Sequence, residues 1–121
     1  MANKSHGRTT PRAELSLRVA FQTRDGLEHT GTTRDLGVRG ASVETPRPPA
    51  EGATVALRID SPTSWDPIIL AGVVQWSSTG PRVDEHGNAA PPGFGVRFGK
   101  LTDEHSAAIR ALIATRAFDE D

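Results

Sequence analysis

The chain has no cysteine, only six aromatic residues and no long apolar run. Without cysteine, disulfides and Cys-based zinc or iron sites are excluded. No segment reaches the roughly 18 apolar residues of a membrane span, and the N-terminus lacks an apolar signal core, so we expect a cytoplasmic protein without membrane insertion. Lys and Arg number 14 against 15 Asp and Glu, a formal charge of −1. Such a chain has no overall attraction for duplex nucleic acid, and any bound anion must meet a local arginine cluster.

The usual catalytic motifs are missing as well. The sequence has no Gly-x-Ser-x-Gly elbow, no His-Glu-x-x-His and no phosphate loop ending in Gly-Lys-Ser/Thr. The histidines lie far apart, and none has a partner at metal-ligand spacing; they are His6, His29, His86 and His105. We therefore expect neither an enzyme nor a metal site.

What the chain does contain is a series of short strand-like segments: three alternate apolar and polar residues, one is apolar on both faces, and two follow turn signals. At 121 residues there is room for one core. A period of two places one face of a segment in the core and the other in water, which is typical of strands. About six strands are predicted: Leu15–Gln22, Leu27–Arg34, Ala41–Thr45, Val55–Ile59, Ile68–Trp76 and Phe94–Phe98. The Gly- and Pro-rich segment Gly80–Gly93 is expected to be a surface loop.

The spacing of apolar residues becomes helical after Thr102, a good N-cap that is followed by two acidic residues. The apolar positions of this helix are Ala108, Ile109, Leu112 and Ile113. Six antiparallel strands followed by one amphipathic helix indicate an all-β fold, a small barrel whose open side or end the helix covers. We divide the chain into an N-terminal arm (residues 1–12), the barrel with its helix (13–117) and a frayed acidic tail (118–121).

A pair of arginines, Arg8 and Arg12, precedes the first strand in Arg-Thr-Thr-Pro-Arg. Pro11 disfavours helix at Thr10, so the arginines can stand up to about 13 Å apart. A guanidinium group binds phosphate oxygens or the O6/N7 edge of guanine in a bidentate manner. Taken alone, such a pair is also ordinary solvated charge near a terminus.

The second local feature is the segment from Asp35 to Gly40, Asp-Leu-Gly-Val-Arg-Gly. A carboxylate can accept two hydrogen bonds from the N1–H and N2–H₂ donors of guanine, and glycines let the backbone approach a flat ligand. Taken alone, this is also an ordinary Asp/Gly turn.

Together the two segments resemble the pattern of the PilZ family. That pattern is Arg-x-x-x-Arg before the first strand and, some twenty residues later, Asp/Asn-x-Ser-x-x-Gly. The resemblance continues through Pro49–Gly52, Gly72–Trp76 and Pro92–Phe98, and covers roughly residues 8–117. It implies a six-stranded antiparallel β-barrel with a C-terminal α-helix that binds the bacterial second messenger cyclic di-GMP.

The resemblance also implies roles for single residues. Arg8 and Arg12 would clamp phosphate and guanine, Asp35 would read a guanine, and Gly40 would shape the turn. Gly37 stands where the family usually has a serine whose hydroxyl bonds the ligand. Such a bond is worth about 0.5–1.5 kcal/mol, or roughly two- to twelve-fold in affinity. Arg34 and Arg39 are candidates to compensate in part.

Three functions remain open at this point. The first is a receptor whose flexible arm becomes ordered around cyclic di-GMP and whose changed surface is read by a partner protein, in motility, biofilm or polarity control. The second is a degenerate PilZ-like adaptor that has lost the nucleotide and works through protein contacts alone. The third, a barrel for single-stranded nucleic acid, is disfavoured because Phe94 and Phe98 belong to the predicted core and no basic groove is evident.

Overall fold

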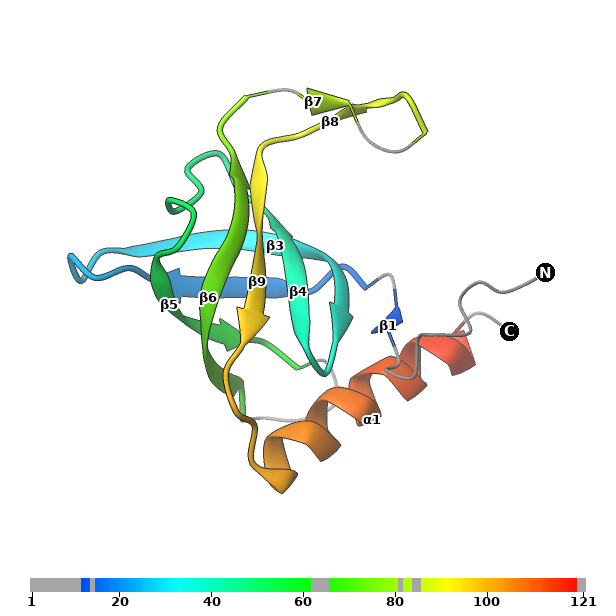
Figure 1. Ribbon diagram of the computed structural model, residues 1–121. Coiled ribbons are helices and arrows are strands. Elements are labelled where there is room, and N and C mark those ends of the chain that lie inside the picture. The colour runs from blue at the N-terminus through cyan, green and yellow to red at the C-terminus, as the bar shows by residue number, and fades with distance from the viewer. Residues whose placement is uncertain (1–11, 14, 62–65, 81, 84–85, 120–121) are drawn as a thin grey trace.

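The computed structural model describes residues 12–13, 15–61, 66–80, 82–83 and 86–119. Within them, six strands form a closed antiparallel barrel, as the sequence predicts (Figure 1). Around the barrel the order is β3-β2-β5-β6-β9-β4, and pairing of β3 with β4 closes it. The strands are β2 (Arg18–Gln22), β3 (Glu28–Gly37), β4 (Gly40–Glu44), β5 (Thr54–Ile59), β6 (Ile68–Ser78) and β9 (Gly93–Phe98).

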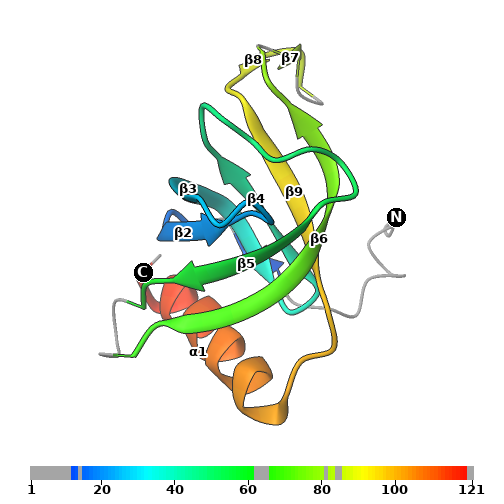
Figure 2. The same ribbon diagram turned by 90° about the vertical axis from the view of Figure 1, so that its left-hand side faces the viewer.

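The remaining elements are attached to the two ends of this barrel. The short strand β1 (Arg12–Ala13) pairs with the last residues of β3, and the helix α1 (Asp103–Asp119) lies across the same end (Figures 1 and 2). Beyond the other end projects a two-stranded ribbon of β7 (Arg82–Val83) and β8 (Ala89–Ala90). The sequence predicted a plain loop there. The ribbon forms because the chain continues from β6 and returns to β9, which are paired neighbours.

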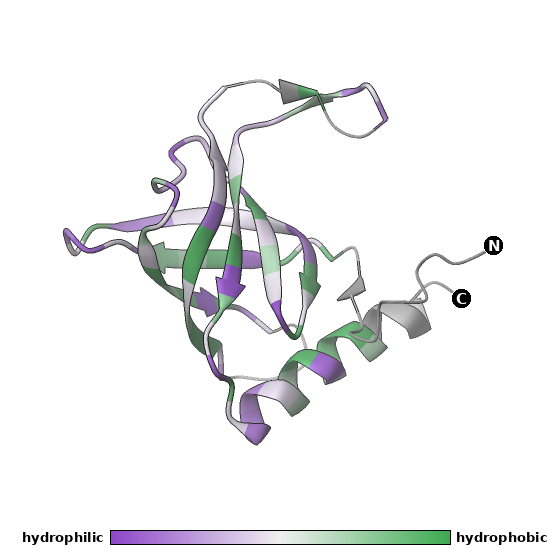
Figure 3. Cartoon of the chain, viewed as in Figure 1, coloured by the Kyte–Doolittle hydropathy of each residue, from purple (hydrophilic) through white to green (hydrophobic). Residues whose placement is uncertain are grey.

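The core is built from the inward side chains of the strands, closed by the helix. Phe21 and Phe94 meet edge to face inside the barrel, with ring centroids 5.0 Å apart, a favoured geometry for aromatic pairs. Ile109 and Leu112 of α1 are buried against the same cluster, and Figure 3 shows apolar residues along the strands and the middle of the helix. Thr102 is the predicted N-cap, since its Oγ1 accepts the N–H of His105 at 3.0 Å. No helix among the described residues has the length and apolar character needed to cross a bilayer.

The predicted first strand starts later than its sequence pattern indicates. Alternation begins at Leu15, whereas β2 begins at Arg18. The reason is the buried side chain of Thr33, which bonds to the backbone of the residues just before β2. Its Oγ1 accepts the N–H of Leu17 at 2.8 Å, and its hydroxyl donates to the carbonyl of Leu15. A side chain thus replaces part of the backbone ladder.

Because of these two hydrogen bonds, Thr33→Val is expected to lower the free energy of unfolding. Valine keeps the shape but leaves the N–H of Leu17 and the carbonyl of Leu15 without their partner in the core. An unsatisfied buried group costs about 1–3 kcal/mol, so urea unfolding should show a loss of that size. Thr32→Val is the matched control, because Thr32 is exposed and surface changes usually stay within about 0.5 kcal/mol. Equal stabilities of the two variants would contradict this role of Thr33.

Candidate functional site

β-Bulges interrupt β3 and β6, and each turns a polar or aromatic side chain outward. In β3 the register shifts between Thr33 and Asp35, so the buried Thr33 and the outward-facing Asp35 lie on opposite faces although they are two residues apart. In β6 the shift lies between Val74 and Trp76, with the same result. Bulges often re-aim a side chain beside a functional site.

The two re-aimed residues belong to one row across four adjacent strands. Asp35 of β3 is opposite Ser42 of β4, Ser42 is opposite Gly95 of β9, and Gly95 is opposite Trp76 of β6. Neighbouring strands lie about 4.8 Å apart, so the row spans roughly 14 Å over the outer surface of the barrel. It carries a carboxylate at one end, an indole at the other and small residues between them.

Local contacts hold both ends of the row in place. The N–H of Ser42 donates to Oδ1 of Asp35 at 3.2 Å, which orients a carboxylate that can accept about four hydrogen bonds in all. At the other end the Trp76 indole lies against the backbone of Gly95, where an added Cβ would come within 2.0 Å of Nε1. Only glycine allows the ring to lie there.

An open groove of about 250 Å³ between β4, β9 and β6 includes Ser42, Gly95 and Trp76 of this row, and Asp35 lies outside its lining. Guanidinium groups stand on its rim: Arg39 comes from the β3–β4 turn, and Arg97 comes from β9 opposite Gly40. The N–H of Phe98 donates to the carbonyl of Arg39 at 2.8 Å and fixes the turn against β9. The groove lining consists of Arg39, Gly40, Ala41, Ser42, Gln75, Trp76, Gly95, Val96 and Arg97.

Comparison with known proteins identifies the family. The PilZ domain pattern matches residues 7–115, which is most of the chain. The chain belongs to the PilZ family. PilZ domains are receptor domains for cyclic di-GMP without catalytic activity, in agreement with the absence of catalytic motifs.

Solved PilZ structures share the fold at low sequence identity. The PilZ domain of YcgR from Escherichia coli, solved with c-di-GMP, has a TM-score of 0.72 and 16% identity, with 93% of both chains covered. The Bacillus subtilis inhibitor of motility MotI/DgrA has a TM-score of 0.68 and 16% identity over 93% of this chain and 52% of its own. The PilZ domain of CeSA from a cellulose-synthesising bacterium has a TM-score of 0.60 and 17% identity, covering 88% and 98%. No curated protein sequence matches the chain.

The two PilZ motifs meet at the end of β3. Arg12 of β1 is the register partner of Gly37, two residues beyond Asp35, so the first motif ends beside the second. Arg8 and the rest of the predicted arm, residues 1–11, lie outside the described residues, and of Arg12 only the backbone is described. The arm and tail boundaries therefore stay predictions.

Strand packing requires a glycine at position 40, a requirement that the sequence did not reveal. Gly40 is the first residue of β4, and an added Cβ would lie 2.2 Å from the carbonyl oxygen of Val96. Real Cβ atoms do not approach so closely. The barrel itself therefore needs glycine here, whatever the turn or a ligand requires.

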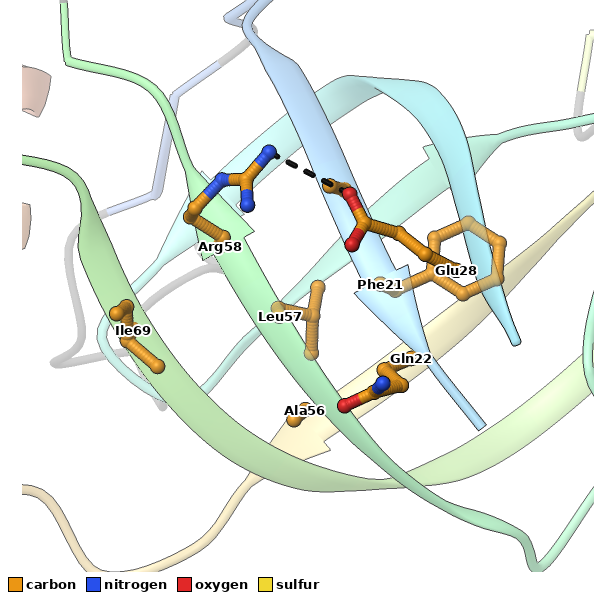
Figure 4. A pocket seen from close by; sticks show the side chains of 8 residues that line it. Phe21, Gln22, Glu28, Ala56, Leu57, Arg58 and Ile69 are labelled. Carbon is orange, nitrogen blue, oxygen red and sulfur yellow. Dashed lines mark hydrogen bonds and ion pairs between the residues drawn. The ribbon is translucent and has the colours of Figure 1, made fainter. Parts of the chain in front are cut away.

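Another hollow lies on the outer face of β2, β5 and β6 (Figure 4). It measures about 170 Å³ and is lined in part by Arg58 and Glu28, which form an ion pair at 3.5 Å. The Glu28 carboxylate repels a phosphate, and it already pairs with the Arg58 guanidinium that would attract one. The groove at β4 and β9 therefore suits an anionic nucleotide better. Among the described residues, no three His, Asp or Glu side chains are grouped as metal ligands.

Sequence reasoning missed several residues that line the groove, above all Ser42, Trp76 and Arg97. Arg97 could have been found, because it is the outward residue between the buried Val96 and Phe98. The outward position of Trp76 could not, because the bulge that produces it leaves no signal in the alternation.

Proposed function

We propose that this PilZ domain is a receptor for cyclic di-GMP that signals through a ligand-dependent change of a protein-interaction surface, in motility, biofilm or polarity control. The observation that carries the proposal is the row from Asp35 through Ser42 and Gly95 to Trp76. It combines a carboxylate that can accept from guanine at one end, an aromatic ring at the other, and arginines beside the groove.

Each end of the row suits one property of a guanine base. The Asp35 carboxylate, oriented by Ser42, can accept from N1–H and N2–H₂ of the base, and hydrogen bonds to charged groups are worth about 1.5–3 kcal/mol each. The Trp76 ring offers a face on which a base can stack, which contributes about 1–3 kcal/mol. These contacts favour a guanine nucleotide over other anions.

The arm would supply the phosphate clamp. Because β1 places Arg12 opposite Gly37, the Arg-x-x-x-Arg motif leads directly to the Asp35 end of the row. Arg8 and Arg12 would then close over the ligand from the β1 side. Ordering of the arm would change the surface that an effector protein meets.

The surface beside the groove supports an output through protein contacts. Ile69 and Val73 on the outer face of β6 are 59% and 41% exposed, and Val73 is the register partner of Arg97 on the groove rim. Exposed aliphatic residues that adjoin a ligand groove give an effector protein a place to contact the domain and the nucleotide together.

The second candidate, a PilZ adaptor without nucleotide, is favoured by Gly37 in place of serine. Titration calorimetry of the wild type and Gly37→Ser with cyclic di-GMP separates the two. A receptor should bind in both forms, with the restored hydroxyl increasing affinity roughly two- to twelve-fold. Binding by Gly37→Ser alone, with no wild-type heat up to ~100 µM ligand, would identify the adaptor.

A further inference from the structure

Arg39 and Arg97 line the same groove, on the other side of the Asp35 segment from β1. We propose that these two arginines bind the second phosphate of the cyclic dinucleotide, the one that the arm does not hold. The inference rests on the proposed function and names residues outside both PilZ motif signatures, since Arg39 occupies a variable position of the second motif and Arg97 lies on β9.

The strand order places β1, which contains Arg12, and the Arg39/Arg97 side of the groove on opposite sides of the last residues of β3. The last residues of β3 have β1 on one side and β4 on the other, and β9 follows β4. Across the surface the sequence is therefore Arg12, Gly37, Gly40 and Arg97, over three strand spacings of about 4.8 Å each. Cyclic di-GMP consists of two identical halves and carries two phosphates, so a site that encloses it needs a cation on both sides.

The structure distinguishes between Arg34 and Arg39, the two arginines that the sequence suggested as partial compensation for the serine hydroxyl missing at Gly37. Arg34 is the extra residue of the β3 bulge, and its Nε lies 3.1 Å from Oε2 of Glu44, so its charge already has a partner. Arg39 lines the groove together with Arg97, and Arg34 is outside that lining. Of the two, Arg39 is the one placed to meet a ligand.

The surroundings of the pair suit a phosphate. Gly40, the register partner of Arg97, lines the groove together with both arginines and has no side chain. Two guanidinium groups on one rim repel each other, and an anion that both can bind in a bidentate manner removes that repulsion. Charge-assisted bonds of this kind are stronger than the neutral serine bond that Gly37 cannot make.

Titration calorimetry with cyclic di-GMP tests the proposal on Arg39→Ala, Arg97→Ala and Arg34→Ala. The last is a matched control that removes the same charge from a position next to Asp35 but outside the groove lining. We expect Arg39→Ala and Arg97→Ala each to weaken binding roughly ten- to hundred-fold, and Arg34→Ala to change it less than about threefold. Arg97→Lys keeps a positive charge but not the bidentate fork, and should recover part of the lost affinity.

The outcomes are distinguishable. Wild-type affinity in Arg39→Ala and Arg97→Ala would overturn the second phosphate site and leave the receptor function intact. A loss in Arg97→Lys as large as in Arg97→Ala would also overturn it, since packing rather than charge would then matter. Absence of binding by the wild type would overturn the receptor function itself. Urea unfolding of every variant is the control for a difference in affinity that arises from lower folding stability.

Discussion

An Arg8→Ala/Arg12→Ala variant is expected to lose all measurable binding of cyclic di-GMP. Both arginines belong to the PilZ motif that leads into the site through β1. Removing one side of a desolvated charge pair costs about 2–5 kcal/mol, which is roughly 30- to 5,000-fold in affinity for a single arginine. Loss of both exceeds the range of titration calorimetry for a ligand of micromolar affinity.

A variant that removes two other arginines controls for the change in net charge. Arg24→Ala/Arg47→Ala alters residues that are exposed and do not line the groove, so its affinity should stay close to that of the wild type. If binding survived in the Arg8→Ala/Arg12→Ala variant, the arm would not be the phosphate clamp, and the first motif would have been assigned wrongly.

The second large effect is expected in stability, for Gly40→Ala. The added Cβ would lie 2.2 Å from the carbonyl oxygen of Val96, a backbone atom held in the β4–β9 ladder. Relief of this clash requires the two strands to separate. Overpacking typically costs about 1–3 kcal/mol and occasionally more, and we expect the upper end or beyond for a clash with backbone.

Alanine substitutions at two other glycines test whether a clash with a backbone carbonyl causes the loss of stability. Gly93→Ala places its Cβ 2.2 Å from the carbonyl oxygen of Val43 in the same strand pair, outside the groove lining, and should destabilise to a similar extent. Gly80→Ala meets nothing within 4 Å and should have little effect in the same urea unfolding experiment. A Gly40→Ala protein as stable as Gly80→Ala would refute the packing role.

The Gly40 result bears on how PilZ motifs are interpreted. A glycine that the barrel requires for strand packing indicates the fold and says little about the ligand. The residues that we propose for ligand binding are Arg8, Arg12 and Asp35, together with the groove residues that the motif does not contain.

Most of the fold could be predicted from local patterns. Alternation located three of the barrel strands (β2, β5 and β9), turn signals located β3 and β4, an apolar run located β6, and the N-cap Thr102 with the helical spacing after it located the helix. The strand and helix pattern already indicated a small barrel, but the pairing of β3 with β4 and of β4 with β9 depends on topology rather than on any one segment and was not predicted from the local patterns.

The orientation of the site could not be predicted, for a definite physical reason. Thr33 and Asp35 are two residues apart, as are Val74 and Trp76, so a strict period of two places each pair on one face. The bulges break that period and send Asp35 and Trp76 outward. A bulge arises from the fit of neighbouring strands and has no local sequence code that alternation can detect.

The central claim is that the row from Asp35 to Trp76 recognises a guanine nucleotide. Its most direct test is titration calorimetry of the wild-type protein with cyclic di-GMP and, in parallel, with cyclic di-AMP. Adenine lacks the N1–H and N2–H₂ donors that a carboxylate accepts, so cyclic di-GMP should bind at least about tenfold more tightly, the value of one hydrogen bond to a charged group. Equal affinity for the two ligands, or no heat with cyclic di-GMP up to ~100 µM, would contradict the claim.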